Sequence, residues 1–240
     1  MFPLRRHAGG PDASFLHPAL LSGLAGTYGV SPPPQEVFDA ILALLSATSY
    51  TTRFAADLED DLPHVPLPGV YATFANAAAL GAAIRGLEGF SNEPSTAYRR
   101  ARLTGTATGV TLAVPTPARA YLADGSGSGV VLLQADGSLR ISGVPERTWT
   151  FEVSGYRVMY RWLAARNGEA LDAALLRAAL DLVWRITELY HLFDSADSVL
   201  DQAVTSPLTR TDLGLPPPSP GRRAGDAAFA TPEDDLESSA

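Results

Sequence analysis

The chain has 240 residues, 46% of them hydrophobic, which suits one large domain or two small ones. Cysteine and lysine are absent, which excludes disulfides, thiolate metal sites, a cysteine nucleophile and a lysine-containing phosphate loop. The formal net charge of −8 is unusual for a nucleic-acid binder. No apolar run approaches the roughly 18 residues of a membrane span, and the N-terminus lacks a signal-peptide pattern, so we expect a cytoplasmic protein without a membrane partner.

The first 97 residues have the apolar spacing of helices. Gly29 is expected to end the first helix, and Ser31 to cap the second. Three prolines between residues 63 and 68 exclude a regular helix and predict an extended segment. The expected helices cover residues 18–28, 32–58 and 71–87.

Residues 98–153 have a different sequence pattern, in which short runs typical of β-strands are separated by residues that favour turns. Asp136-Gly137 lies between two apolar runs and predicts a β-hairpin. Residues 124–129, rich in glycine and serine, are expected to form a flexible surface loop. The candidate strands cover residues 98–106, 110–114, 130–134, 139–142 and 149–153.

Helical periodicity resumes at Arg157, with a short helix that ends near Gly168. A long helix follows over residues 171–192, and its pattern extends towards Val204. Later residues are rich in Pro, Gly, Ala and acids, so we expect disorder. The predicted class is α+β, with N-terminal helices, a central antiparallel β region, C-terminal helices and a disordered tail. The segments are 1–97, 98–204 and 205–240, the first two forming one module.

Charge is distributed unevenly along the chain. Residues 98–166 carry a net charge of +5, whereas residues 1–97 and 167–204 each carry −5 and the tail carries −3. A basic region between acidic flanks can localise an anionic ligand. The planar guanidinium group of arginine presents several N–H donors in a fixed geometry that suits phosphate oxygens and the guanine base edge. The candidate contacts are Arg99, Arg100 and Arg102 on a predicted strand, where Arg100 and Arg102 share one face, and Arg140 on the hairpin. Arg157 and Arg161 are four residues apart and are expected on one face of a helix, with Tyr156 beside them. The alternative is that these arginines only keep the surface soluble and that the tyrosines pack in the core.

No catalytic or metal-binding motif stands out. Residues 125–129 contain a Gly-x-Ser-x-Gly string, but a nucleophile elbow needs a strand before it and a helix after it, and here a strand is expected to follow. The four histidines are scattered, and the acidic residues 59–61 are read as a solvated helix end. We therefore expect no catalytic, cofactor-binding or metal-binding residue in this chain.

Residues 149–163 read WTFEVSGYRVMYRWL. This stretch resembles the Tyr-x-Val-x-Gly-Tyr-x-Val-x-x-x-Trp-Leu signature of the C-terminal specificity domain of type ISP restriction–modification enzymes and related large adenine-specific DNA methyltransferases. Phe151 stands where the family usually has Tyr, and Ser154 where it often has Gly. Further similarity covers residues 2–4, 37–50, 53–54 and 62–67 in the same order, so the resemblance spans about residues 2–204. Residues 87–90 and His64 depart from the family pattern.

The resemblance implies a target-recognition module for double-stranded DNA, in a restriction–modification or phage-defence system. A partner methyltransferase domain or subunit would bind S-adenosylmethionine and flip the target adenine through an Asn-Pro-Pro-Tyr motif, which this sequence lacks. The chain therefore looks like a C-terminal portion, either a fragment or a separately encoded subunit. Two alternatives stay open: a protein-interaction module that docks onto a methyltransferase or helicase partner, and an inactive truncated remnant.

Overall fold

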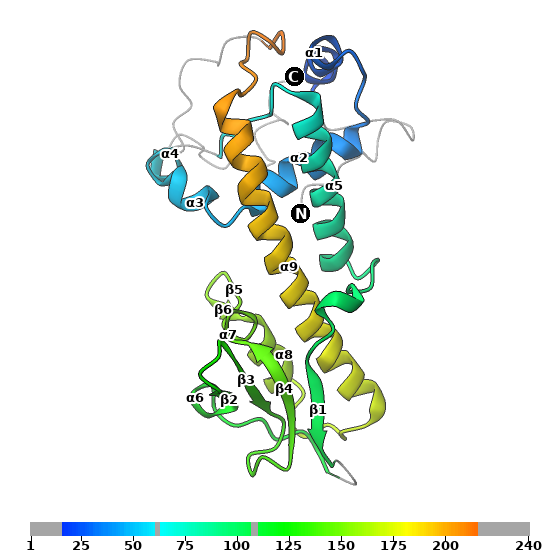
Figure 1. Ribbon diagram of the computed structural model, residues 1–240, viewed down its shortest axis with the longest axis vertical. Coiled ribbons are helices and arrows are strands. Elements are labelled where there is room, and N and C mark those ends of the chain that lie inside the picture. Colours follow the sequence, from blue (N-terminus) through cyan, green and yellow to red (C-terminus); the bar gives the residue numbers. More distant parts are fainter. Residues whose placement is uncertain (1–15, 61–62, 107–109, 216–240) are drawn as a thin grey trace, which may run out of the picture. The chain divides into compact units, whose positions relative to one another are not determined.

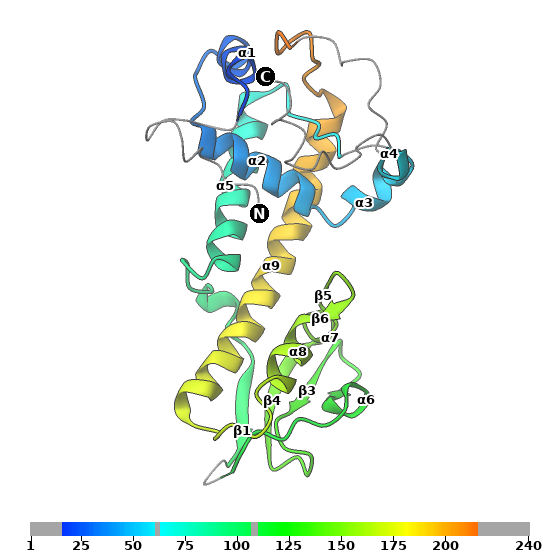
Figure 2. The same cartoon turned by 180° about the vertical axis from the view of Figure 1, so that it is seen from behind.

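The computed structural model describes residues 16–60, 63–106 and 110–215 (Figures 1 and 2). The chain divides into two compact units. Unit 1 comprises Met1–Ala82 and Phe193–Ala240, and unit 2 comprises Ala83–Leu192. This division differs from the expected boundary at residue 97, because the long helix α9 (Ala173–Thr205) begins in unit 2 and ends in unit 1. A boundary drawn along the sequence alone misses such a return of the chain.

Unit 1 is helical. It contains α1 (Pro18–Tyr28), α2 (Pro34–Ser46), α3 (Tyr50–Arg53), α4 (Ala55–Asp60), most of α5 (Tyr71–Glu88) and the end of α9. Gly29 ends α1 with a left-handed φ of 71°, as its position predicts. Ser31 does not cap the second helix, because α2 begins only at Pro34 and Pro33 holds the capping position without a side-chain hydrogen bond.

The helix predicted to run through Leu58 is broken after Ser46. Ala47 adopts an extended ψ of 130°, and Ser49 donates from its backbone N and its Oγ to Asp197 Oδ1, at 2.8 and 2.7 Å. This long-range contact with α9 replaces the local helical continuation, so tertiary structure overrides the apolar period.

The core of unit 1 lies between α2, α5 and the end of α9. Its buried residues include Val37, Leu44, Phe74, Val199 and Leu200. Gly81 of α5 packs directly on the backbone of Asp39 in α2, where a Cβ atom would clash with the carbonyl group.

Residues 63–68 form no helix, as their prolines predict, and Pro68 makes an isolated bridge to Pro207. Leu208 N donates to Leu67 O at 2.8 Å, and Leu213 is only 6% exposed. The prediction that the disordered tail starts at residue 205 is therefore wrong for residues 206–215, which are part of the folded unit. Residues 216–240, the rest of that tail, lie outside the described residues.

Unit 2 is built around a four-stranded antiparallel sheet of order β1-β4-β3-β2. Its strands are β1 (Arg102–Gly105), β2 (Tyr121–Ala123), β3 (Ser128–Leu132) and β4 (Leu139–Pro145). The hairpin predicted at Asp136-Gly137 joins β3 and β4, with Gly137 at a φ of 74°. Residues 110–114 do not form a strand, because they make only isolated bridges to Gln134 and Ala170, and β2 is not among the predicted strands.

Helices cover one face of this sheet, as Figures 1 and 2 show for α8 (Val158–Ala164). The inward residues Val131, Leu139 and Ile141 pack with Met159 of α8 and Ile186 of α9. The smaller elements are η1 (Thr96–Tyr98), α6 (Pro117–Ala120), α7 (Glu146–Trp149), β5 (Glu152–Val153) and β6 (Tyr156–Arg157). The predicted strand over residues 149–153 is confirmed only at Glu152–Val153, because Trp149 is the last residue of α7 and Thr150 caps that helix with its N–H donating to Glu146 O.

The expected α+β class is confirmed, with N-terminal helices, a central antiparallel sheet and C-terminal helices. Among the described residues, no helix combines the length and the apolar character that crossing a membrane requires.

Candidate nucleic-acid interface

The outward face of the four-stranded sheet carries two exposed arginines. The register pairs Arg102 with Ser142 and Thr104 with Arg140, whereas Leu103 pairs with the buried Ile141. Since side chains alternate between the two faces of a strand, the first four residues share the face opposite to the core. Arg102 and Arg140 are diagonal neighbours there, a relation in which the two residues typically lie roughly 7–8 Å apart.

Neither arginine is neutralised by a carboxylate in the part of the chain that the structure describes. Arg102 Nη1 donates to Ala101 O at 2.9 Å and also to Arg99 O, and Arg140 Nη1 donates to Gly137 O at 3.5 Å. Carbonyl oxygens orient a guanidinium but leave its positive charge uncompensated. The remaining N–H groups are therefore able to bind an anion.

The same face is hollowed beside Arg140. A shallow cavity of about 460 Å³ is lined by Leu122, Val130 and Leu132 together with Arg140, Ser142 and residues of the β3–β4 turn. Leu122 is 52% exposed, and Thr104 Oγ1 lies 3.0 Å from Ser142 Oγ. The face thus combines cationic donors, hydroxyl groups and an apolar floor.

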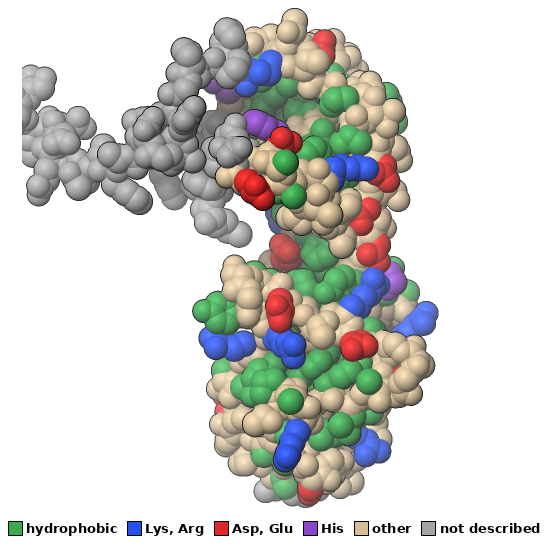
Figure 3. Space-filling model, turned by 90° about the vertical axis from the view of Figure 1, so that its left-hand side faces the viewer, with side chains coloured by type: hydrophobic (Ala, Val, Ile, Leu, Met, Phe, Trp, Pro, Cys, Tyr) green, Lys and Arg blue, Asp and Glu red, His purple; other side chains and the backbone are tan. Residues whose placement is uncertain are grey.

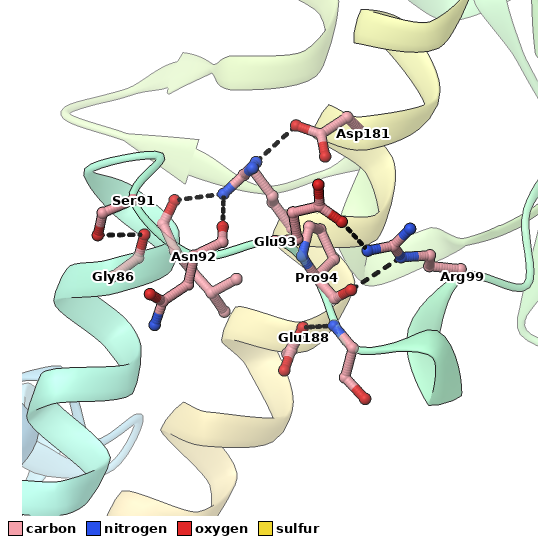
Figure 4. A network of polar contacts seen from close by, with 11 residues as sticks. Gly86, Ser91, Asn92, Glu93, Pro94, Arg99, Asp181 and Glu188 are labelled. Carbon is pink, nitrogen blue, oxygen red and sulfur yellow. Dashed lines mark hydrogen bonds and ion pairs between the residues drawn. The ribbon is translucent and has the colours of Figure 1, made fainter.

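The prediction that Arg99 and Arg100 lie on a strand is wrong, because β1 begins only at Arg102. Ser95 caps the 3₁₀ turn η1, and Arg99 follows that turn. Its Nη2 pairs with Glu93 Oε2 at 2.7 Å, and its Nε donates to Pro94 O at 2.8 Å (Figure 4). Its guanidinium also lies 5.7 Å from the centre of the Trp184 ring. Arg99 is thus already engaged, and it also lowers the pKa of the Glu93 carboxyl through a hydrogen bond and its charge.

Arg100 is exposed, and its Nε donates to Ala97 O at 3.3 Å. It lies outside the sheet face, so it does not share that face with Arg102 as predicted.

Arg185 of α9 is a charged residue inside the fold, which the sequence pattern does not predict. It is only 7% exposed, with its Nε 2.6 Å from Asp181 Oδ2, and its Nη1 donates to Leu87 O and Asn92 O at 3.1 and 2.6 Å. Figure 4 shows these contacts beside Glu188, which accepts from Ser95 N. The network fixes the loop that leads to Arg99. Its one sequence signal is the i,i+4 spacing of Asp181 and Arg185 within an apolar helix.

The remaining candidates lie at the β5–β6 hairpin. Arg157 belongs to β6 and precedes α8 as its N-cap, so it is not on a common helix face with Arg161 as predicted. Arg157 Nε lies 3.2 Å from Glu152 Oε1, and the Arg161 guanidinium lies 4.7 Å from the centre of the Tyr156 ring. Tyr156 is 57% exposed. Three of the predicted residues are therefore brought together here, apart from the sheet face.

The glycine–serine stretch forms a defined turn between β2 and β3. Asp124 Oδ1 accepts hydrogen bonds from Ser126 Oγ and Ser126 N at 2.7 and 2.8 Å, and these bonds lower the pKa of the carboxyl group. The turn connects two strands, which is not the strand–helix setting of a nucleophile elbow. No cluster of three or more potential metal ligands occurs within the described ranges. Asp61 of the acidic run lies outside those ranges.

The two units differ in charge. Unit 2 contains 12 of the 18 arginines and 10 of the 26 acidic residues, a net charge of +2, which leaves −10 for the residues of unit 1. On the face of unit 2 in Figure 3, basic side chains are interspersed with hydrophobic ones. A polyanion is therefore attracted to unit 2 rather than to unit 1.

The solved structures that resemble this chain include two complexes with DNA or a DNA mimic. A cryo-electron-microscopy structure of a DrdV–DNA complex aligns with 90% of the chain at 16% identity and a TM-score of 0.52. A nuclease-deletion mutant of the Type ISP restriction–modification enzyme LlaGI, in complex with a DNA substrate mimic, aligns with 70% of it at 14% identity and a TM-score of 0.38. The chain spans 21% of the DrdV chain and 13% of the LlaGI chain.

No curated protein matches the chain in sequence. The profile of the Type ISP C-terminal specificity domain matches residues 1–181. With three quarters of its length matched, the chain belongs to the Type ISP C-terminal specificity domain family.

Proposed function

We propose that this chain recognises double-stranded DNA as the target-recognition part of a restriction–modification enzyme. The observation that carries the proposal is the outward face of the sheet in unit 2, where Arg102 and Arg140 have no carboxylate partner in the described chain. A DNA backbone offers an array of phosphate oxygens, and two guanidinium groups on neighbouring strands are suited to bind them.

The same face offers groups that can distinguish bases. Arg140 borders the apolar hollow that contains Leu122 and Val130, and Ser142 and Thr104 supply hydroxyl groups. Phosphate contacts would position the module, and a smaller number of contacts to base edges would specify the sequence. Arginine recognises guanine, hydroxyl groups bond to several bases, and an apolar surface contacts the thymine methyl group.

The fold supports the proposal by analogy. The DrdV structure, to which the chain is similar over most of its length, is a complex with DNA. Membership in a specificity-domain family points in the same direction. The proposal extends to a partner methyltransferase domain, specific for adenine, that binds S-adenosylmethionine and carries out the transfer of the methyl group. That extension rests on the resemblance of residues 149–163 to enzymes of this kind.

A second function, protein docking, is favoured by the charge of unit 1. A net charge of −10 repels DNA, whereas Val70 and Tyr71, 56% and 40% exposed, offer apolar surface for a protein partner. The two functions are compatible, with unit 2 contacting DNA and unit 1 contacting the catalytic partner.

Fluorescence anisotropy with a short random-sequence duplex tests DNA binding. The expected result is binding at micromolar protein concentration in low salt, the affinity expected of a non-specific DNA complex. The affinity is then expected to fall as the salt concentration is raised. A selection from a random pool then tests target reading, with enrichment of one sequence as the expected outcome. Absence of binding at low salt would overturn the proposal and leave docking as the function.

A further inference from the structure

The β5–β6 hairpin ends in a tight turn with an exposed apolar tip. Val153 and Tyr156 pair across the two strands and are 54% and 57% exposed. Ser154 and Gly155 connect them with φ values of 52° and 77°, the two consecutive positive values of a type I′ turn. A serine in the left-handed region costs about 1–2 kcal/mol relative to its usual conformations. The fold therefore holds two large apolar side chains in water at a strained turn.

The base of the hairpin is anchored in the core of unit 2. Val158 N donates to Phe151 O at 3.0 Å, and the Phe151 ring packs edge-on against Tyr190 with centroids 5.5 Å apart. Met159, the next residue in α8, is fully buried. Figures 1 and 2 show the hairpin extending beyond the end of the four-stranded sheet. The tip is therefore an exposed projection on a base that is packed into the core of unit 2.

The Tyr156 ring is covered on one side by a cation. The Arg161 guanidinium lies 4.7 Å from the ring centre, and within the described ranges it forms no ion pair with a carboxylate. Arg157, by contrast, is neutralised by Glu152 at the base of the hairpin. The tip thus presents an aromatic ring, an aliphatic side chain and one uncompensated positive charge.

We infer that this tip is a wedge that enters duplex DNA and unstacks a base step. Tyr156 stacks on an exposed base, Val153 fills the space that opens between the bases, and Arg161 contacts the adjacent phosphate. Apolar wedges of this kind open base steps in many DNA complexes, and aromatic side chains stack on bases of any sequence. The inference rests on the proposed function and goes further, because it assigns a mode of contact to an element separate from the sheet face.

Charge favours DNA as the occupant of this surface. A protein partner could cover the apolar surface of Val153 and the Tyr156 ring. The positive charge of Arg161 beside them, which has no carboxylate partner in the described ranges, is stabilised only if the partner also places an anion there. A DNA base step supplies both, since the stacked bases offer apolar faces and the phosphates lie next to them.

The test uses the full chain and a short random-sequence duplex with 2-aminopurine in place of the adenines of one strand. Anisotropy reports binding, and 2-aminopurine fluorescence reports unstacking. The wild-type chain is expected to bind and to raise the fluorescence. Tyr156→Ala is expected to weaken binding by about 5- to 150-fold, the range for loss of one stacked base, and to abolish the rise. Tyr156→Phe keeps the ring and is expected to retain both signals.

Tyr71→Ala is the matched control, because it removes an exposed tyrosine from unit 1 and is expected to leave the fluorescence rise intact. Circular dichroism confirms that each variant is folded. A wild-type chain that binds without a rise in fluorescence, or a Tyr156→Ala variant that keeps the rise, would overturn the wedge and leave the proposed function standing. A wild-type chain that does not bind DNA would overturn both.

Discussion

At the scale of residues, burial distinguishes the roles of Arg185 and Arg140, which the sequence pattern alone does not distinguish. Arg185 is 7% exposed and bonds to a carboxylate and two backbone carbonyls, whereas Arg140 is exposed and bonds to one distant carbonyl. The first stabilises the fold, and the second is free to contact a ligand. The sequence could not rank them, because the partners of Arg185 at Leu87 and Asn92 lie more than 90 positions away.

Replacement of Arg185 by Met is expected to lower the free energy of unfolding by about 3 kcal/mol. The variant leaves the Asp181 carboxylate and two carbonyl oxygens without their donor, and breaking a buried pair in this way costs several kcal/mol. Arg53→Met is the matched control, because its ion pair with Asp201 is exposed and is worth at most about 1 kcal/mol. Urea denaturation measures both, and equal losses would contradict the distinction.

At the scale of elements, local signals predict structure where neighbours in sequence decide it. Gly29 ends α1, and Asp136-Gly137 turns the β3–β4 hairpin, as expected. The single helix predicted through Leu58 fails because Ser49 bonds to Asp197 of α9, and β2 escapes prediction because it is only three residues long. For the candidate site, the sequence predicts the arginine and tyrosine cluster of unit 2 but not its separation into a sheet face and a hairpin.

The contact between α2 and α5 depends on Gly81. Gly81→Ala is expected to lower the free energy of unfolding by about 1–3 kcal/mol, because the new methyl group meets the Asp39 backbone in a packed core. Gly26→Ala provides the control within α1, where no atom lies within 4 Å of the added carbon. Alanine favours a helix there, so this variant is expected to gain about 0.5–1 kcal/mol. Thermal melting distinguishes the two, and a neutral Gly81→Ala variant would show that the helices do not pack so closely.

At the scale of the whole molecule, each unit contains a tyrosine that resists ionisation. Burial raises the pKa of Tyr28 in unit 1 and of Tyr121 in unit 2 to about 12. Tyr28 donates to Pro68 O at 2.6 Å, and Tyr121 donates to Val144 O at 3.1 Å. Because the folded pKa values exceed the unfolded value of 10.0, the stabilisation is complete below pH 10 and is lost as the pH rises towards 12.

Melting temperatures measured across this window should therefore fall steeply above pH 10. Tyr28→Phe is expected to flatten the decline because it removes one ionising hydroxyl, and Tyr71→Phe, at a more exposed position, is the matched control. If Tyr28→Phe and the wild-type chain decline in parallel, the buried hydroxyl of Tyr28 does not contribute to the alkaline transition.

The division of charge between the units makes the overall net charge of −8 a poor guide to function. Unit 2 alone has a net charge of +2, and two arginines of its sheet face, Arg102 and Arg140, have no carboxylate partner among the described residues. Binding to DNA is thus expected in spite of the acidic total, and its salt dependence should come from unit 2.

The salt dependence of DNA binding by single arginine variants tests this claim most directly. The slope of log K against log salt is expected to fall in magnitude by about 0.9 for Arg102→Ala and again for Arg140→Ala, because each removes one phosphate contact. Arg53→Ala, which removes the same charge from unit 1, should keep the wild-type slope. An unchanged slope in both sheet variants, or an equal reduction in Arg53→Ala, would contradict the assignment of the DNA-binding surface to the sheet of unit 2.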